Sequence, residues 1–524
     1  MRRLELLFTS MAPIVASVSR PRALLAVLLG VLAAALLGMG MMGLRAYSAE
    51  AATAATTCTE SLQAQIDAAE PGGVLTAAPC IYRERIEINK PLTLKGQEGT
   101  EIRGSDVFGS WRKRLSDGRY VSRRAVPPFP ETMDQIFCMP DTVRCHLPEQ
   151  VFFDGRALVQ VVGNQPPSKA FSLTKDRRVI LGSGMDPRGR MVEVSVRREW
   201  VVGTSSADDV TIDNVDMRHA ANSGRTGALL NRPYQTAWTD TGSNWTVKNS
   251  TLAHAHGAII SLNVKGGGTG HHILNNRILF GGQLGVHGAA RGSVISGNEI
   301  ARNNTELYCP NPRCGIGETG GIKVADSSDV TVEGNFIHDN FGHGIHFDVN
   351  TYANTITDNR IYRNARMGIQ YELSSDALIA RNRVIGNGYD VYETIKNPSI
   401  NVLASSDVEV ADNVVSGGAS GINVSAYNRQ GFDSTVSGVY VHDNAIIRNG
   451  GKALTWSDGN GSIAADPTNR GYSNDFWYPR AENGSARFEW GGRDFSQLSR
   501  FNATRGEEDG RYMSDAEKDA VLAE

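Results

Sequence analysis

The sequence predicts an all-β protein built as a parallel β-helix, a solenoid of short stacked strands. An Asn followed two residues later by an aliphatic residue recurs at Asn276, Asn298, Asn335, Asn359, Asn382, Asn413 and Asn444. Several spacings lie at 22 to 24 residues (298−276, 359−335, 382−359), and a period of this size indicates a solenoid. Within the repeat, stretches such as DVTVEGNFI and DVEVADNVV alternate apolar and polar residues and are rich in Val and Thr, which is typical of strands. The 56 glycines and the low aromatic content of 7% suit a turn-rich β protein.

Residues 1–51 have the composition of a targeting segment. Arg2, Arg3, Arg20 and Arg22 precede an apolar run at 23–43, and small residues follow it. This is the order of a signal peptide, but about 20 apolar residues are also enough to span a bilayer. We therefore expect either a cleaved signal peptide or an N-terminal membrane anchor. In both cases the rest of the chain is exported across the cytoplasmic membrane and is secreted or displayed at the cell surface.

The six cysteines predict three disulfides, because an exported chain meets an oxidising compartment. They fall in near pairs, and neighbour pairing closes the shortest loops: Cys58 with Cys80, Cys138 with Cys145, and Cys309 with Cys314. Six cysteines allow 15 connectivities, and free buried thiols remain an alternative. None of the spacings resembles a zinc site.

Residues 52–109 are expected to hold an N-terminal cap and the first coils. The stretch CTESLQAQIDAAEPGG predicts a short helix with Thr59 as N-cap, Leu62 and Ile66 on one face, and a stop at 71–73. A solenoid end exposes unpaired strand edges and apolar core, so a capping helix is expected there.

The remaining segments follow from breaks in the repeat. Residues 110–200 lack the repeat and contain hairpin-like stretches, with a type I′ turn signal at Asp154-Gly155. We expect a small β-rich insert there, the β-helix with its Asn ladder at 201–450, and a C-terminal cap and tail at 451–524. Asn214 and Asn249 are expected to extend the ladder upstream.

The stretch SLQAQIDAAEPGGVLTAAPCIYRERIEINKPLTLKG and the Asn-ladder coils resemble the right-handed parallel β-helix, or pectin-lyase-like, superfamily over about residues 58–450. The resemblance implies right-handed coils. It implies less about function, because that superfamily includes polysaccharide lyases, glycoside hydrolases, epimerases and phage adhesins.

Charge and motifs exclude other classes of function. The formal net charge of −3 gives no electrostatic reason to expect a nucleic-acid partner. The sequence shows no P-loop, nucleophile elbow or dinucleotide-binding glycine fingerprint. We expect a glycan as partner, a membrane contact only through an uncleaved N-terminal segment, and a monomer.

The coils align on their glycines, as in Gly344-Ile345-His346-Phe347-Asp348 and Gly368-Ile369-Gln370-Tyr371-Glu372. The second and fourth positions are nearly all apolar, so the third and fifth face away from the core. The third position forms a polar row: His287, Lys323, His346, Gln370, Asn401 and Asn423. The fifth position carries two acids, Asp348 and Glu372, beside small or apolar residues.

The two acids are expected to be neighbours on adjacent coils. Each lies 13 residues after a ladder asparagine (348−335 and 372−359). Adjacent strands are about 4.7–4.9 Å apart, so the carboxyl groups can approach to about 5 Å, which matches retaining rather than inverting glycosidases. Repulsion between them is expected to raise one pKa and leave the other group ionised, as a general acid and a nucleophile require.

The pair also resembles that of β-helix glycoside hydrolases of the β-xylosidase type. The resemblance implies that Asp348 is the nucleophile and Glu372 the acid/base. We expect no cofactor and no metal, and we expect the substrate to contact Lys323, His346, Gln370, Asn401, His287 and His343.

Two alternatives stay open. The first is a polysaccharide lyase or epimerase in which Lys323 is the base, with Ca²⁺ held by the stacked acids and help from Arg366. The second is a non-catalytic surface protein that only binds glycans.

Overall fold

The computed structural model describes most of the chain after residue 55. The described residues are 56–114, 116–129, 138–139, 142–204, 207–232, 241–262, 268–288, 291–309, 318–389, 397–429, 431–432, 434–458, 461–482 and 484–524. The predicted signal peptide or anchor at 1–51 lies outside them and stays a prediction. Within these ranges no helix is both long enough and apolar enough to cross a membrane.

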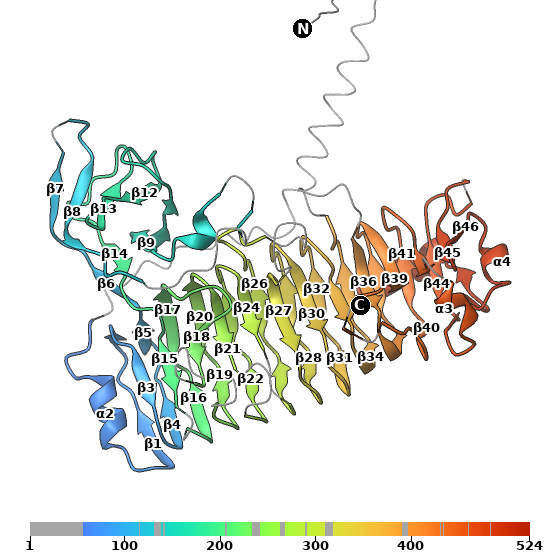
Figure 1. The fold of residues 1–524 in the computed structure, drawn as a ribbon, viewed down its shortest axis with the longest axis horizontal. Helices are drawn as coiled ribbons and strands as arrows, with labels where there is room; N and C mark the ends of the chain where they lie inside the picture. The colour runs from blue at the N-terminus through green and yellow to red at the C-terminus, as the bar shows by residue number, and fades with distance from the viewer. Residues whose placement is uncertain are drawn as a thin grey trace, which may run out of the picture. The chain divides into compact units, whose positions relative to one another are not determined.

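The described region is a right-handed parallel β-helix whose coils each contribute strands to three long sheets (Figure 1). We number the sheets 1, 2 and 3 in the order in which the chain visits them.

Sheet 1 has 12 strands, in the order β1 (Gly73–Thr76), β4 (Leu92–Lys95), β16 (Val210–Asp213), β19 (Thr246–Lys248), β22 (His272–Leu274), β25 (Val294–Ser296), β28 (Thr331–Glu333), β31 (Asn354–Thr357), β34 (Ser375–Ala380), β37 (Ser406–Ala411), β40 (Tyr440–His442) and β43 (Arg470–Tyr472).

Sheet 2 has 13 strands, in the order β2 (Ile81–Tyr82), β5 (Glu101–Arg103), β17 (Asp216–Ala220), β20 (Thr251–Ala255), β23 (Arg277–Leu279), β26 (Glu299–Ala301), β29 (Phe336–His338), β32 (Arg360–Tyr362), β35 (Arg383–Ile385), β38 (Val414–Ser416), β41 (Ala445–Ile447), β44 (Asp475–Trp477) and β47 (Arg511–Tyr512).

Sheet 3 also has 13 strands, in the order β3 (Ile86–Ile88), β15 (Val201–Gly203), β18 (Gly227–Leu230), β21 (Ala258–Ser261), β24 (Leu284–His287), β27 (Gly320–Ala325), β30 (His343–Asp348), β33 (Ile369–Glu372), β36 (Pro398–Leu403), β39 (Ser420–Ala426), β42 (Leu454–Asp458), β45 (Phe488–Trp490) and β46 (Arg493–Phe495). Only its last pair, β45 with β46, is antiparallel.

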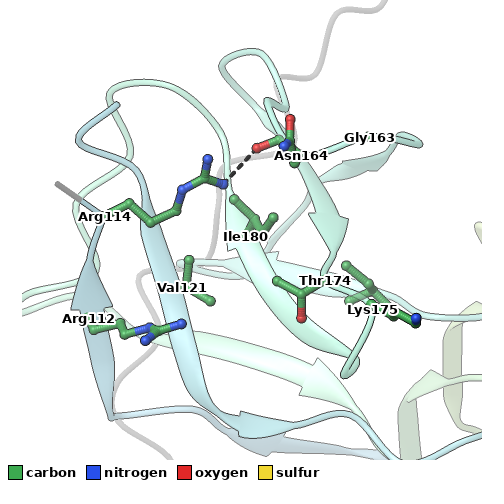
Figure 2. A pocket seen from close by; sticks show the side chains of 9 residues that line it. Arg112, Arg114, Val121, Gly163, Asn164, Thr174, Lys175 and Ile180 are labelled. Carbon is green, nitrogen blue, oxygen red and sulfur yellow. Dashed lines mark hydrogen bonds between the residues drawn. The ribbon is translucent and has the colours of Figure 1, made fainter. Parts of the chain in front are cut away.

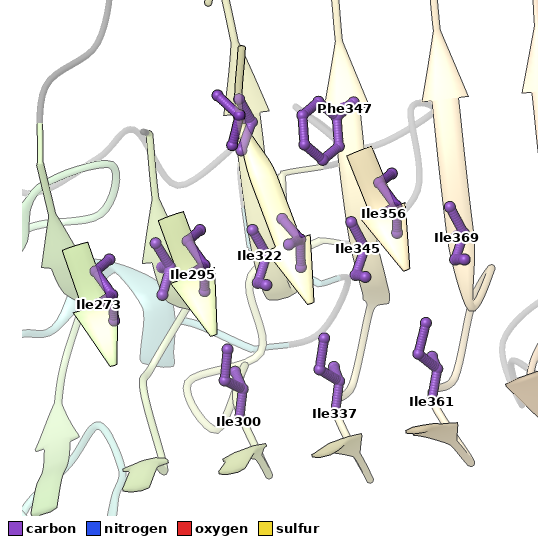
Figure 3. Close-up of a cluster of buried hydrophobic side chains, with 14 of the residues drawn as sticks. Ile273, Ile295, Ile300, Ile322, Ile337, Ile345, Phe347, Ile356, Ile361 and Ile369 are labelled. Atoms are coloured by element: carbon purple, nitrogen blue, oxygen red, sulfur yellow. The ribbon is translucent and has the colours of Figure 1, made fainter. Parts of the chain in front are cut away.

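Aliphatic side chains fill the space between the three sheets in axial rows (Figure 3). Ile322, Ile345 and Ile369 of sheet 3 are in register on consecutive strands and are almost fully buried. Stacking like residues on like residues lets every coil bury the same face, so the core continues from coil to coil.

The Asn ladder lies at the turn between sheets 1 and 2. The Nδ2 of Asn335 donates to the Oδ1 of Asn359, and the Nδ2 of Asn359 donates to the Oδ1 of Asn382, both at 3.0 Å. Upstream the prediction was wrong: the backbone N–H of Ser250 donates to the Oδ1 of Asn276, whereas Asn249 adopts a positive φ and donates to Asp213 instead.

A second ladder, which the sequence analysis did not identify, lies between sheets 2 and 3. The Nδ2 of Asn303 donates to Asn340, that of Asn340 to Asn364, and that of Asn364 to Asn387, at 2.8–2.9 Å. Each member follows a first-ladder asparagine by five residues, for example Asn364 after Asn359.

The stack continues past the predicted boundary at residue 450. The strands β42, β43, β44, β45 and β47 pair in parallel with the coils before them. The first ladder also continues, because Asn444 donates to Asn474, and Asn474 donates to the Oε2 of Glu507 at 2.7 Å. The predicted loss of the ladder after residue 450 was therefore wrong. Asn474 follows Asn444 by 30 residues (474−444), close to the spacing of 31 before it (444−413), and Glu507 takes the place of the next asparagine.

The N-terminal helix α2 (Leu62–Ala68) has Leu62 and Ile66 buried against the core, as predicted. Its N-cap is Ser61, whose Oγ accepts from the backbone N–H of Ala64, so the choice of Thr59 was wrong. The other helices among the described residues are the 3₁₀ turn η2 (Arg144–His146), α3 (Ser462–Ala465), α4 (Leu498–Phe501) and α5 (Asp515–Ala523).

The β-rich insert has a core of its own and consists of two small sheets, antiparallel except for the pair β11–β12. One sheet contains β10 (Arg156–Ala157), β9 (Val151–Phe153), β14 (Val192–Ser195) and β6 (Ser105–Val107). The other contains β11 (Val159–Gln160), β12 (Ala170–Leu173), β13 (Arg178–Leu181), β8 (Tyr120–Ala125) and β7 (Trp111–Lys113). The predicted hairpin turn at 154–155 joins β9 to β10, and both turn residues have positive φ.

Two predicted disulfides are confirmed, Cys58–Cys80 and Cys138–Cys145. Cys309 is also disulfide-bonded, while its predicted partner Cys314 lies outside the described residues.

Candidate active site

The predicted polar row lies on sheet 3 in the predicted register. His287 pairs with Lys323, Lys323 with His346, His346 with Gln370, and Gln370 with Asn401. The row results from the alternation of the strands, since Ile345 and Phe347 on either side of His346 belong to the core. His343 lies at the start of β30, with its ring centroid 4.7 Å from that of His346.

The polar row faces away from the core, yet it is not open to solvent. Lys323, His346 and Gln370 are only 3–6% exposed. Asp348 and Glu372, at the ends of β30 and β33, have 17% and 12% of their side chains exposed. The two carboxylates are therefore the more accessible members of the group, and the row forms a layer of buried polar support beneath them.

Asp348 and Glu372 are brought together by adjacent strands, as the register argument predicted. Phe347 and Tyr371, the residues just before them, are direct partners across the β30–β33 ladder. One carboxylate oxygen of each acid and one ring nitrogen of His346 all lie within 4.8 Å of one another.

A chain of polar contacts links the two acids. The Nζ of Lys323 donates to the Oδ2 of Asp348 at 2.5 Å and lies 3.3 Å from the Nδ1 of His346. An ammonium group can only donate, so Nδ1 is the acceptor and the ring hydrogen is on Nε2. That Nε2 lies 3.2 Å from the Oε2 of Glu372, to which it donates.

The Asp348 carboxyl group is held in its ionised form. Burial is the largest influence and would raise its pKa, but the charge of Lys323 and the hydrogen bonds from Lys323 and the backbone of Val349 outweigh it. The result is a pKa of about 2. A carboxylate that stays ionised at almost any pH is suited to act as a nucleophile or to stabilise a positive charge.

The pKa of Glu372 is lowered as well, so the predicted splitting of the two values was wrong. Burial and the charge of Asp348 act to raise it, but hydrogen bonds from His346 and Tyr427 stabilise the ionised form more strongly. The Nε2 of Gln370 also donates to the same carboxylate. Repulsion between the acids does not dominate because Lys323 contacts Asp348 and His346 contacts Glu372.

The three residues His346, Asp348 and Glu372 are grouped closely enough to bind a metal ion. However, the Lys323 ammonium already supplies a positive charge to Asp348, and the Oε2 of Glu372 already accepts from His346. A cation bound here would have to displace these contacts. The donor set therefore fits Ca²⁺ poorly, because Ca²⁺ requires six to eight oxygen ligands.

The outer members of the polar row have fewer contacts with the acids. Asn401 accepts from the Nδ2 of Asn423 at 2.7 Å. Burial lowers the pKa of His287 to about 4 and that of His343 well below its usual value, so both rings are neutral at physiological pH. The Nδ1 atoms of both histidines are buried without a hydrogen-bond partner among the described residues.

Comparison with known proteins places this architecture. The family model "Right handed beta helix region" matches residues 237–413. The solved complex of XylC with xylose superposes with a TM-score of 0.63 at 16% sequence identity, over 87% of this chain and 83% of that chain.

The chain is a right-handed parallel β-helix protein.

Other solved structures are more distant. A double mutant of the periplasmic alginate epimerase AlgG gives a TM-score of 0.43 at 15% identity, over 80% of this chain and 84% of that chain. The catalytic unit of a GH87 α-1,3-glucanase from Streptomyces thermodiastaticus gives a TM-score of 0.45 at 13% identity, over 88% of this chain and 68% of that chain. A search of curated proteins gave no significant match.

Two residues of this β-helix contact the carboxylate pair and were missed by the sequence analysis. Tyr427 and Arg429 follow β39, two strands beyond β33. The Tyr427 hydroxyl donates to the Oε1 of Glu372 at 2.8 Å, and Arg429 lies 3.9 Å from the Oδ1 of Asp348. Both belong to a connection rather than to the repeat, so no periodic pattern points to them.

Proposed function

We propose that the protein is an exported retaining glycoside hydrolase that acts on an extracellular polysaccharide or oligosaccharide. The observation that carries the proposal is the carboxylate pair: oxygens of Asp348 and Glu372 within 4.8 Å on adjacent strands. Retaining enzymes need carboxyl groups about 5–5.5 Å apart so that one of them can attack the sugar directly.

Asp348 is the nucleophile. Its ionised carboxylate attacks the anomeric carbon and forms a covalent glycosyl-enzyme, which water later cleaves. Lys323 keeps the carboxylate ionised and fixes its orientation through the contact with Oδ2. The Oδ1 atom accepts from the backbone N–H of Val349 at 2.9 Å and lies 3.9 Å from Arg429, and as the oxygen without the Lys323 contact it is the one that attacks.

Glu372 is the acid/base. In its protonated form it gives a proton to the leaving oxygen, and as a carboxylate it then takes a proton from the attacking water. Because His346 and Tyr427 stabilise the ionised form, the acid role requires acidic surroundings. This requirement makes the proposal sensitive to pH.

The other assignments follow from this function. The polar row of Lys323, His346, Gln370 and Asn401, with His287 and His343, supports the acids and contacts the sugar. The partner is a glycan, the protein acts as a monomer, and the reaction uses no cofactor. The disulfides Cys58–Cys80 and Cys138–Cys145 favour an oxidising compartment, as export requires.

One observation favours a second candidate, a lyase or epimerase that removes a proton next to a uronate carboxyl group. Both Asp348 and Glu372 have lowered pKa values, so neither is a ready proton donor in the free protein. In that reaction Lys323 would serve as the base. To do so it would have to leave its ion pair with Asp348.

The deciding experiment is product analysis. The purified protein is incubated with a panel of neutral and acidic polysaccharides and with aryl glycosides, including an aryl xyloside because the XylC structure holds xylose. We expect new reducing ends, an NMR spectrum in which the first-formed sugar keeps its anomeric configuration, and no effect of EDTA. An inverted product contradicts retention. Unsaturated products that absorb near-ultraviolet light would establish the lyase instead.

A further inference from the structure

The five-stranded sheet of the insert has two different faces. Tyr120, Phe171 and Val179 lie on one face and pack into the core of the insert. The register pairs Arg112 with Val121, and Val121 with Ile180, so these three side chains share the opposite face. That face looks away from the insert's own core.

A pocket of about 660 Å³ lies on this opposite face (Figure 2). Val121, Ile180 and Leu173 line its apolar part; the first two are only 1% exposed, so the half-buried Leu173 supplies most of the accessible apolar surface. Arg112, Arg114 and Lys175 also line it. The volume falls within the range of about 300–1,000 Å³ that is common for small-molecule sites.

The pocket carries unbalanced positive charge. Arg114 pairs with Asp117 at 3.0 Å and donates to the backbone oxygen of Asn164 at 2.8 Å. Arg112 and Lys175 are exposed and form no ion pair with any described residue. None of the nine lining residues is acidic. The site therefore favours an anion, and two of its cations have no partner of their own.

The combination of cationic, apolar and amide groups in the pocket favours one class of anion over others. A small inorganic ion would use the cations but leave the apolar surface of the half-buried Leu173 without contact. A sugar ring that carries a carboxylate presents an apolar face of C–H groups together with the charge and hydroxyl groups. The exposed Asn164 at the rim adds an amide that can pair with hydroxyls.

We propose that this pocket binds a carboxylate-bearing sugar unit of an acidic polysaccharide, with Arg112 and Lys175 as its cationic contacts. It is a second, non-catalytic glycan site. It uses no residue of the Asp348–Glu372 pair, so it stands whether or not that pair is a glycosidase centre.

The test is calorimetric binding of a galacturonic acid hexamer to the full-length chain carrying Asp348→Asn and Lys323→Gln, so that neither the glycosidase nor the lyase reaction can consume the probe. In this background Arg112→Gln with Lys175→Gln should weaken binding by roughly tenfold, as expected for the loss of two partly exposed charge contacts. The fully methyl-esterified hexamer should bind the parent poorly.

The matched control is Lys113→Gln. Lys113 is the exposed neighbour of Arg112 in β7, but it pairs with Tyr120 and so projects from the other face. This variant removes one positive charge, as each single substitution of the double variant does, and should bind the hexamer within twofold of the parent. Unchanged thermal unfolding of all variants shows that the fold is intact.

Three outcomes overturn the proposal. In the first, the double variant and the Lys113→Gln control bind the hexamer equally well. In the second, the acid and ester forms of the hexamer bind equally well. In the third, inorganic sulfate displaces the hexamer at equimolar concentration. The last result would indicate a site for small anions only.

Discussion

Lys323 and Asp348 form a buried ion pair across adjacent coils, with 2.5 Å between Nζ and Oδ2. Only 4% of the lysine side chain is exposed, compared with 17% of the aspartate. The ammonium group is therefore the more deeply buried partner, and the carboxylate is the more accessible one. This arrangement fixes the charge state on which the proposed chemistry depends.

Asp348→Asn should abolish turnover of every substrate, because no covalent intermediate can form. Glu372→Gln should instead depend on the leaving group: an aryl glycoside with a good leaving group should still react in the first step, and added azide should accelerate release of the intermediate. Initial rates with two aryl glycosides check both expectations. Glu333→Gln on the exposed edge of β28 is the control and should keep full activity. Full activity of Asp348→Asn would contradict the assignment.

The pH dependence should reveal an acidic enzyme. The free enzyme must have Asp348 ionised, which holds above a pKa of about 2, and Glu372 protonated, which holds below a pKa lying under the ordinary 4.5. The profile of kcat/KM should therefore be bell-shaped with its maximum between these limits. A maximum near pH 7 would exclude Glu372 as the acid in the described geometry and would favour the lyase.

Tyr427→Phe should move the basic limb of that profile to higher pH. The hydroxyl donates to the ionised form of Glu372, so its removal destabilises the carboxylate and raises the pKa of Glu372. The measurement is kcat/KM against pH. Tyr440→Phe, on the exposed side of β40, is the matched control and should leave the profile unchanged. Identical profiles for all three proteins would show that Tyr427 does not influence the acid.

Asn359→Ala should lower the free energy of unfolding by roughly 1–3 kcal/mol, because ladder partners lose their hydrogen bonds in a buried turn. Its Nδ2 donates to Asn382 and to the carbonyl of Val332, and its Oδ1 accepts from Asn335. Chemical denaturation measures the loss. Activity below the unfolding range should survive. Unchanged stability together with lost activity would mean that the ladder has a catalytic rather than a structural role.

The register of the site could be predicted because it depends on local alternation and a counted offset. Residues such as Lys323 and His346 occupy equivalent positions in coils that the asparagines mark. The contacts of Tyr427 and Arg429 could not be predicted, because these residues lie in a connection whose path no repeat defines. The lowered pKa of Glu372 was not predicted for a related reason. It depends on which N–H and O–H groups donate to the carboxylate, and the spacing of residues in the sequence does not show this.

Glu507 should make stability depend on pH. Burial raises its pKa to about 8, so the folded protein keeps a proton there that the unfolded chain releases above about pH 4.5. The free energy of unfolding should fall as the pH rises from about 4.5 to about 8, by on the order of 1.4 kcal/mol per pH unit at most. Chemical denaturation at a series of pH values measures this change. The plot of unfolding free energy against pH should be flatter for Glu507→Gln over this interval. The control is Glu508→Gln at the half-buried neighbour, which pairs with Arg470, and it should leave the slope unchanged. Equal slopes for all three proteins would contradict the raised pKa of Glu507.

The first ladder also has a polarity. Every amide in it donates toward the C-terminal end of the solenoid, so the side-chain dipoles from Asn276 to Asn474 add head to tail. Glu507 receives the last donor and has no amide hydrogen to pass on. A coil inserted between two asparagine coils would continue these hydrogen bonds, whereas a coil appended after Glu507 would meet a carboxyl group, which has no amide N–H to continue the ladder. Lengthening of this solenoid is therefore favoured in its interior and opposed at its C-terminal end.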